Sequence, residues 1–214
     1  MLNNLDQSLY TRFKREGYRI AKYKDSPVAT IADLVRLGYL DVNRTIRGVT
    51  DEQSRSIKET VQAFVEGLLT RPPATIAEFD ERHNQCCQDC VAHTAVGGAR
   101  VHYGQSQKIV NMALKYLYNE YATYRGVSNQ FGFPDMGVEH FFHLPIDNQV
   151  LDTLVGKCHF SKTTLLPWSQ WPRTDYLQFQ HQVRRRLNAR YCPLELDYMI
   201  WNIKGPALDL AFMS

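Results

Sequence analysis

The chain has 214 residues, of which 44% are hydrophobic and 22% charged, a composition typical of a folded globular protein and unlike that of a disordered one. Its net charge of +3 permits a nucleic-acid partner without requiring one. No apolar run is long enough to span a membrane and the first residues do not form a secretory signal, so we expect no membrane contact and a cytoplasmic location. The five cysteines are an odd number, which favours a reducing compartment over a disulfide framework.

Helical periodicity dominates the first half of the chain. Apolar residues at helical spacing predict a helix over Asn3–Ala21, and Thr30 is a candidate N-cap for a second, short helix. Thr50 and Thr75 are each followed three residues later by Gln or Glu, the capping-box pattern. The helices they open are predicted to end at the Pro-Pro pair 72–73 and at about His93.

The second half continues in the same way. Helices are predicted over residues 104–120, 147–154, 172–187 and 192–201, with a loop over 165–172 that ends on a proline suited to a first helical turn. Alternating strand patterns are few. We therefore predict an all-α fold, a single helical domain over residues 1–214, with a hairpin-like core at 101–155 and a C-terminal helical part at 172–204.

One predicted helix carries a cluster of metal-binding residue types: His83, Cys86, Cys87, Cys90 and His93. Steps of three and four place most of them on one helix face, and zinc accepts such ligands. Four ligands on one straight helix do not easily surround an ion tetrahedrally, and paired Cys-x-x-Cys knuckles are missing. We expect these cysteines to pack in the core and no metal to be bound, with a zinc site as the alternative.

Lys108 and Asp147 are the two residues whose positions suggest chemistry. Each stands at a predicted helix start, Lys108 after Gly104 and Asp147 after Pro145. A glycine-opened helix start presents free backbone N–H groups that favour an anion such as a phosphate. A lysine in a partly dry pocket becomes a nucleophile for carbon, and a facing carboxylate can take its proton or stabilise a developing positive charge.

This order resembles the helix-hairpin-helix DNA glycosylases, in particular the branch that includes 8-oxoguanine glycosylase. In that family a Gly-x-Gly-x-Lys hairpin leads into an apolar helix, and a Pro-Val-Asp segment starts the next one. Gly104-Gln105-Ser106-Gln107-Lys108 is similar to the hairpin, with Ser106 in place of its second glycine, and Pro145-Ile146-Asp147 is similar to the second segment. The likeness covers about a quarter of the chain, and the intervening segment from about Tyr121 to Phe142 is longer than in the family.

The resemblance implies roles for particular residues. Lys108 would be the Schiff-base nucleophile and Asp147 the catalytic aspartate, while the N–H groups around Gly104 would hold a DNA phosphate, with a monovalent cation as the one possible cofactor. The DNA contacts would be Gly104, Gln105, Ser106, Gln107, Arg184, Arg185 and Arg186. The pocket for an extruded base would include Tyr103, His143, Trp168, Trp171 and Tyr176.

The implied function is removal of a damaged or modified base from double-stranded DNA by base flipping, in repair or in defence against phage, with or without strand cleavage. The alternatives are a non-catalytic nucleic-acid-binding module and a protein-interaction domain. In both, Lys108 is an ordinary first-turn residue and Asp147 a simple N-cap. For the run Arg184–Arg186, favourable placement at a helix C-terminus is the alternative to phosphate binding. The base recognised and the oligomeric state are not readable from the sequence.

Overall fold

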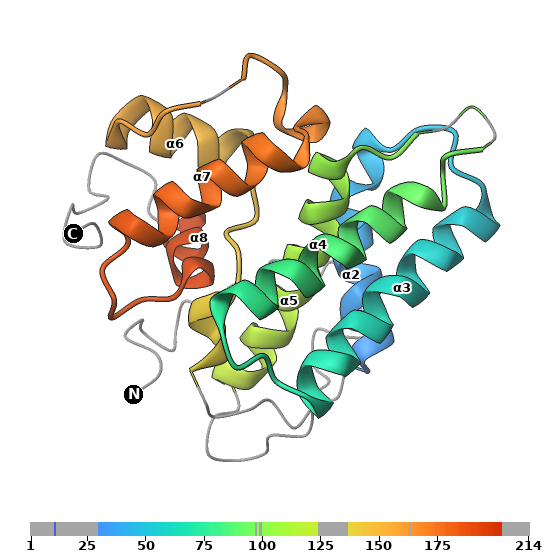
Figure 1. The fold of residues 1–214 in the computed structure, drawn as a ribbon, viewed down its shortest axis with the longest axis horizontal. Helices are drawn as coiled ribbons and strands as arrows, with labels where there is room; N and C mark the ends of the chain where they lie inside the picture. Colours follow the sequence, from blue (N-terminus) through green and yellow to red (C-terminus); the bar gives the residue numbers. More distant parts are fainter. Residues whose placement is uncertain are drawn as a thin grey trace.

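The computed structural model of the chain describes Thr11 and residues 30–96, 98, 100–123, 137–162 and 164–202. Over these residues the protein is an all-α domain without strands, which confirms the predicted fold class (Figure 1). The predicted helix over Asn3–Ala21 lies outside the described residues, apart from Thr11. No helix in the described part of the chain combines the length and the apolar character needed to cross a membrane.

Seven α-helices and three short 3₁₀ helices make up the described fold. The α-helices are α2 (Ile31–Val42), α3 (Asp51–Thr70), α4 (Ile76–Ala92), α5 (Tyr103–Thr123), α6 (Asn148–Cys158), α7 (Arg173–Arg186) and α8 (Pro193–Asn202). The 3₁₀ helices are η2 (Asn43–Thr45), η3 (Val138–Phe141) and η4 (Trp168–Gln170). Each α-helix corresponds to a helix that the sequence predicts, with differences of a few residues at the ends.

The predicted N-caps are confirmed, because side-chain oxygens of threonine accept the free N–H groups of the first turns. Thr30 and Thr50 form complete capping boxes at the starts of α2 and α3. Thr75 accepts from the backbone N–H of Glu78 at 3.1 Å, but the Glu78 carboxylate accepts from Ala74 instead of closing the box on Thr75. Pro172 is the N-cap of α7 and not, as predicted, a residue of its first turn.

Helix α5 runs through the centre of the molecule, and every residue from Gly104 to Glu120 is buried. A helix that is surrounded on all sides needs a close neighbour, and α2 approaches it through Gly38. A Cβ added at Gly38 would lie 2.8 Å from the Ala113 nitrogen and 2.9 Å from the Ile109 oxygen. Only glycine therefore permits this contact between α2 and α5.

Two hydrophobic clusters pack on opposite sides of α5. The first is built mainly from α2, α3, α4 and α5, and the second from residues 144–160, α7 and part of α8. Polar residues of α5 lie between the clusters and contact the C-terminal elements. These buried polar residues are Gln107, Lys108, Asn111, Lys115 and Asn119.

Candidate functional site

Lys108 and Asp147 meet in the folded chain. The Lys108 Nζ lies 2.6 Å from Asp147 Oδ2 and 3.4 Å from the carbonyl oxygen of Pro145. Their side chains keep only 7% and 14% of their surfaces exposed. The other carboxylate oxygen of Asp147 accepts the backbone N–H of Val150 at 2.9 Å, so Asp147 is also the predicted N-cap of α6. An amine and a carboxylate that are 39 residues apart thus share a site with little solvent access.

The segment that carries Asp147 is held by two helices. Gln107 of α5 donates to the carbonyl oxygen of Ile146 at 3.5 Å and to that of Gly104 at 2.8 Å. Gln180 of α7 pairs with Leu144 in both directions, through its Oε1 at 3.0 Å and its Nε2 at 2.7 Å. These bonds satisfy buried polar groups of an irregular segment, which otherwise would destabilise the fold. They also fix the carboxylate relative to the amine.

The stretch Gly104–Lys108 is not the predicted glycine turn. Helix α5 begins at Tyr103, so this stretch is already helical and Lys108 lies in the second turn. Gly104 donates its N–H to the Trp171 oxygen at 3.0 Å, and a Cβ added there would collide with the Trp168 carbonyl. The glycine therefore serves the close approach of the η4 loop to α5, and its amide faces a protein acceptor instead of solvent.

The three residues after Gly104 are buried as well. Gln105 donates to the Thr45 carbonyl oxygen at 2.6 Å and so ties η2 to the first turn of α5. Ser106 is fully buried, and its hydroxyl has no hydrogen-bond partner among the described residues. In this conformation three of the predicted phosphate contacts, Gly104, Gln105 and Gln107, bind other parts of the protein, and the fourth, Ser106, is buried.

A chain of buried hydrogen bonds runs from α5 to the far end of α7. Asn111 donates to the Tyr176 hydroxyl at 2.8 Å, and this hydroxyl bonds His143 Nδ1 at 2.7 Å. On its other side His143 Nε2 lies 2.9 Å from Asp80 Oδ1, and Arg184 grips the same carboxylate through two bonds of 2.8 and 2.7 Å. Two predicted pocket residues, Tyr176 and His143, are thus fully buried links in this chain.

Burial and charge set the protonation states of the residues in this hydrogen-bond chain. Burial lowers the pKa of His143 to about 4, and it also places the pKa of His83 well below the ordinary value. Burial alone would raise the pKa of Asp80, but hydrogen bonds from His143 and Arg184 outweigh it and lower that pKa strongly. Neutral histidines therefore face an ionised Asp80 at neutral pH, with His143 donating through Nε2 and accepting from Tyr176 through Nδ1.

The other predicted pocket residues lie in or beside η4 and at the start of α5. Trp171 is buried and donates its indole N–H to the Leu166 oxygen at 2.9 Å, whereas Trp168 is half-buried in η4. The Tyr103 ring lies 5.7 Å from that of Tyr176, and its hydroxyl donates to Asn84 at 3.4 Å.

The arginines of the predicted phosphate patch have different surroundings. Besides gripping Asp80, Arg184 donates to the Phe141 oxygen. Arg186 donates to the Cys158 and His159 carbonyl oxygens at 2.7 and 3.2 Å, at the C-terminal end of α6, and stacks over the Phe160 ring. Arg185 is exposed and has no hydrogen bond or ion pair within the described chain. Two of the three guanidiniums therefore join elements of the fold to one another.

A second buried lysine–aspartate pair lies two turns further along α5. Lys115 bonds Asp197 of α8, with 2% and 0% of the side chains exposed, and lies 4.6 Å from the centre of the Tyr198 ring. Sequence reasoning missed it, although polar residues recur at every fourth position from Gln107 to Asn119. That periodicity in an otherwise apolar helix is a signal of polar contacts along one buried face.

The cysteine cluster lies in the first hydrophobic cluster. Cys86, Cys87 and Cys90 are free and buried. Burial raises the pKa of the Cys87 thiol well above its usual value, which makes it unreactive. His83 bonds Asn111 at 3.0 Å, and its other ring nitrogen lies 3.7 Å from the Cys87 sulfur. Among the described residues, no three His, Cys, Asp or Glu side chains are arranged to hold a metal ion.

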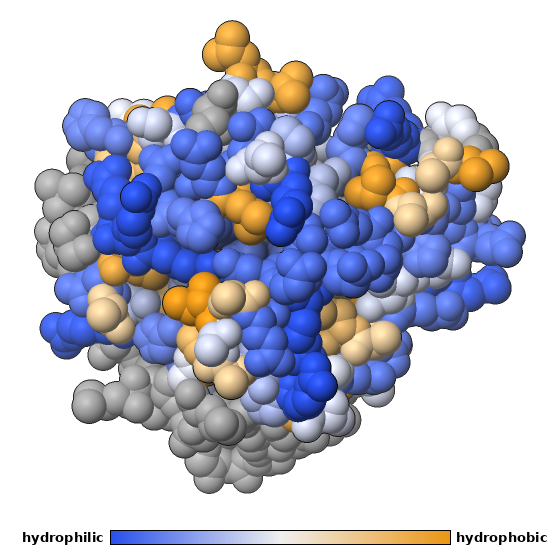
Figure 2. All heavy atoms as spheres, viewed as in Figure 1, coloured by the Kyte–Doolittle hydropathy of each residue, from blue (hydrophilic) through white to orange (hydrophobic). Residues whose placement is uncertain are grey.

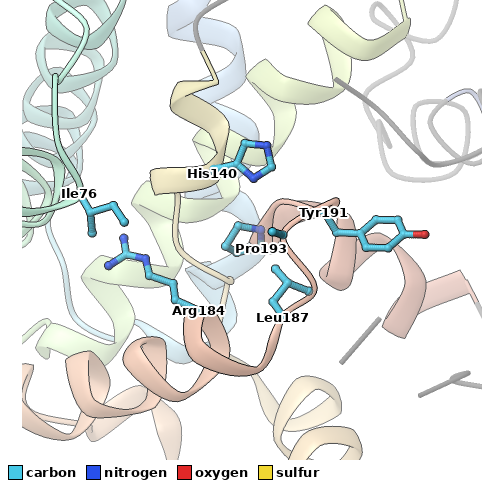
Figure 3. Close-up of a pocket in the computed structure, with 7 residues that line it drawn as sticks. Ile76, His140, Arg184, Leu187, Tyr191 and Pro193 are labelled. Carbon is cyan, nitrogen blue, oxygen red and sulfur yellow. The ribbon is translucent and has the colours of Figure 1, made fainter. Parts of the chain in front are cut away.

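A surface pocket lies at the far end of the hydrogen-bond chain, away from Lys108. It has a volume of about 330 Å³ and lies between the first residue of α4, η3 and the end of α7 (Figure 3). Its lining is Ile76, His140, Arg184, Leu187, Ala189, Tyr191 and Pro193. Since the Arg184 guanidinium is already bound to Asp80, this pocket is mainly apolar, and it contains neither Lys108 nor Asp147.

No family model matches the sequence, and neither the curated proteins nor the solved structures contain a match to the chain.

Proposed function

We propose that the protein is a DNA N-glycosylase that removes a damaged or modified base, with Lys108 and Asp147 as its reacting groups. The observation that carries the proposal is the 2.6 Å contact between the Lys108 amine and the Asp147 carboxylate. The contact joins residues 39 positions apart in a site that is nearly closed to water. Such a site strengthens electrostatic interactions and favours proton transfer between its members.

The chemistry uses both groups and needs no cofactor. Asp147 accepts a proton from Lys108, and the free amine forms a bond to C1′ of the sugar while the glycosidic bond breaks. The bonding electron pair leaves with the base, which takes the proton back from Asp147. Loss of a second proton from the amine to the ring oxygen opens the sugar and yields a protonated imine. Water activated by Asp147 in place of the amine would release the base without an imine.

The substrate is double-stranded DNA with its target base flipped out, which costs a few kcal/mol and least for a mispaired or damaged base. Because so little of the pair is exposed, DNA binding must open the surroundings of Lys108 before a sugar can reach the amine. Tyr103 and Trp168 are half-buried aromatic residues near the start of α5, and we propose them as stacking partners of the base. Repair and defence against phage both remain as biological roles.

The proposal is tested with a panel of duplexes that carry damaged or modified bases, including modified phage DNA. We expect base release, and a covalent protein–DNA adduct after borohydride reduction of the imine. Lys108→Gln should abolish the adduct and Asp147→Asn should abolish base release, whereas Lys157→Gln, a change at an exposed lysine of α6, should preserve both. Base release without any adduct would assign the attack to water, and no base release across the panel would refute the proposal.

A non-catalytic DNA-binding module is the second candidate. It is favoured by the hydrogen bonds that both side chains already form within the protein. Asp147 caps α6, and Lys108 also bonds the Pro145 oxygen. This candidate predicts salt-dependent DNA binding that Lys108→Gln does not weaken, with no base release on any substrate.

A further inference from the structure

Several chain segments that are far apart in the sequence meet at the end of the molecule where α5 begins. Gln105 holds the Thr45 carbonyl oxygen of η2, and Gln53 at the start of α3 donates to the Val96 oxygen at 3.1 Å. The η4 loop closes the other side through the Gly104–Trp171 bond. In Figure 1 the end of α2, the start of α3, the end of α4 and the start of α5 gather at this edge.

Three arginines lie at this end without protein partners. Arg44 and Arg47 flank Thr45, and Arg100 directly precedes Val101, whose N–H bonds the Thr94 hydroxyl at 2.9 Å. All three are exposed, and within the described chain none forms a hydrogen bond or an ion pair. By contrast, the guanidiniums of Arg184 and Arg186 are hydrogen-bonded to other parts of the protein. We call the surface of Arg44, Arg47 and Arg100 the entry face.

The loop that leads into η4 exposes apolar side chains. Leu165 is fully exposed and Leu166 is 44% exposed. Figure 2 shows apolar atoms at the outer edge of the loop between α6 and α7, above a mostly hydrophilic surface. Asp51 and Glu52, in the first turn of α3, offset part of the positive charge of the entry face. The cations therefore form a local group and not a broad basic surface.

We propose that the entry face binds backbone phosphates of duplex DNA and places the duplex over the start of α5. This inference rests on the proposed function, since Lys108 lies one turn beyond Gly104. Guanidiniums that lack internal partners can bind phosphate oxygens without breaking a protein contact. Binding releases counterions from the DNA, so each arginine contributes to the salt dependence of the affinity. The entry face thus replaces Arg184 and Arg186 as the main phosphate contact.

The test compares two triple variants with the same change in charge. Arg44→Gln, Arg47→Gln and Arg100→Gln are combined in one variant, and Arg36→Gln, Arg71→Gln and Lys157→Gln, exposed positions elsewhere, in the other. Fluorescence anisotropy measures the Kd for a labelled duplex over a series of salt concentrations. For the entry-face variant we expect the slope of log Kd against log salt to fall by about 1 per arginine, and the Kd to rise roughly tenfold or more. The control variant should change little.

Equal losses in both variants, or no loss in the entry-face variant, would overturn the proposal. Binding of the wild-type protein to phosphatidylserine vesicles but not to duplex DNA would overturn it too. Base release, measured in parallel, separates this inference from the proposed function. If DNA binding depends on the entry face while no substrate loses a base, the glycosylase proposal fails and the entry face stands. If bases are released and the entry-face variant keeps its affinity for DNA, the entry-face proposal fails and the glycosylase proposal stands.

Discussion

Two lysine–aspartate pairs lie on one side of α5, seven residues apart, yet they differ in their surroundings. Lys108 and Asp147 keep 7% and 14% of their side chains exposed, and Asp147 belongs to a helix start. Lys115 and Asp197 are sealed between α5 and α8, and the lysine also lies against the Tyr198 ring. Two lysines of one helix thus form ion pairs of different kinds, one at the margin of the hydrophobic core and one inside it.

The difference indicates which pair a ligand could reach. A sealed ion pair has no route for a substrate, so its effect is on stability and on the specificity of packing. In the Lys108 pair the carboxylate also accepts the Val150 N–H and keeps slightly more solvent contact, so loss of the lysine should destabilise the fold less. This pair is within reach of a ligand once neighbouring side chains move. The variants below are expected to separate these two roles, from the largest effect on stability to the smallest.

Lys115→Met should have the largest effect. It leaves the Asp197 carboxylate buried without its cation, which we expect to lower the free energy of unfolding by about 3–5 kcal/mol. Urea titration followed by circular dichroism measures the change. The double variant Lys115→Met/Asp197→Leu, which removes both charges, should recover part of the loss. A single variant as stable as the wild type would show that the sealed pair is not a structural element.

Acid should lower the stability of the fold through the buried hydrogen-bond chain between α5 and α7. The pKa of His143 is lowered to about 4 in the folded state from an ordinary value of 6.5. The unfolded chain therefore binds this proton first as the pH falls, and stability should drop between about pH 6.5 and 4 by up to roughly 3 kcal/mol. The lowered pKa of Asp80 adds a further loss below about pH 4. Unfolding titrations over this range should show the drop, and His143→Gln should reduce its first part, to which the lowered pKa of His83 also contributes.

Gly104→Ala should loosen the packing of η4 against the start of α5 and leave the Lys115 pair intact. The added methyl group collides with the Trp168 carbonyl, so the η4 loop must shift, at a cost of about 1–3 kcal/mol. Hydrogen exchange should become faster at residues 165–171 and stay unchanged around Leu117. Gly156→Ala is the matched control, because a Cβ at Gly156 meets nothing within 4 Å. Unchanged exchange in the η4 loop would contradict the packing described here.

Lys108→Gln should have the smallest effect on stability. Both side chains are mostly buried, but Asp147 keeps the Val150 N–H and a little solvent contact, so we expect a loss of about 1–2 kcal/mol. Thermal unfolding of this variant beside Lys115→Met gives the comparison directly. A loss as large as that of Lys115→Met would place the two pairs in the same structural class.

Local signals predicted much of this fold. Threonine caps, proline stops and apolar periodicity identified the α-helices from α2 to α8, because these features act within a few residues of the chain. The capping role of Asp147 followed from the same local rule. The sequence also pointed to Lys108 and Asp147 as partners through a resemblance, and the fold brings these two residues into contact.

The remainder depends on contacts that local patterns do not encode. Gly104 was interpreted as a turn residue, but its small size serves the approach of η4, a segment more than 60 residues away. For Arg184 and Arg186 the sequence offers placement at a helix C-terminus or a phosphate patch, but their long side chains reach Asp80 and the end of α6. The pair of Lys115 and Asp197 joins residues 82 apart, and neither stands at a helix start that would have drawn attention to it.

The most direct test of the account is to map the lysine that carries the borohydride-reduced adduct. After reaction with a substrate duplex the protein is digested, and mass spectrometry locates the modified residue. The account predicts the adduct on Lys108 and none on Lys115, which lies on the same helix but is sealed in the core. An adduct on Lys115 or on a surface lysine, with Lys108 unmodified, would contradict it.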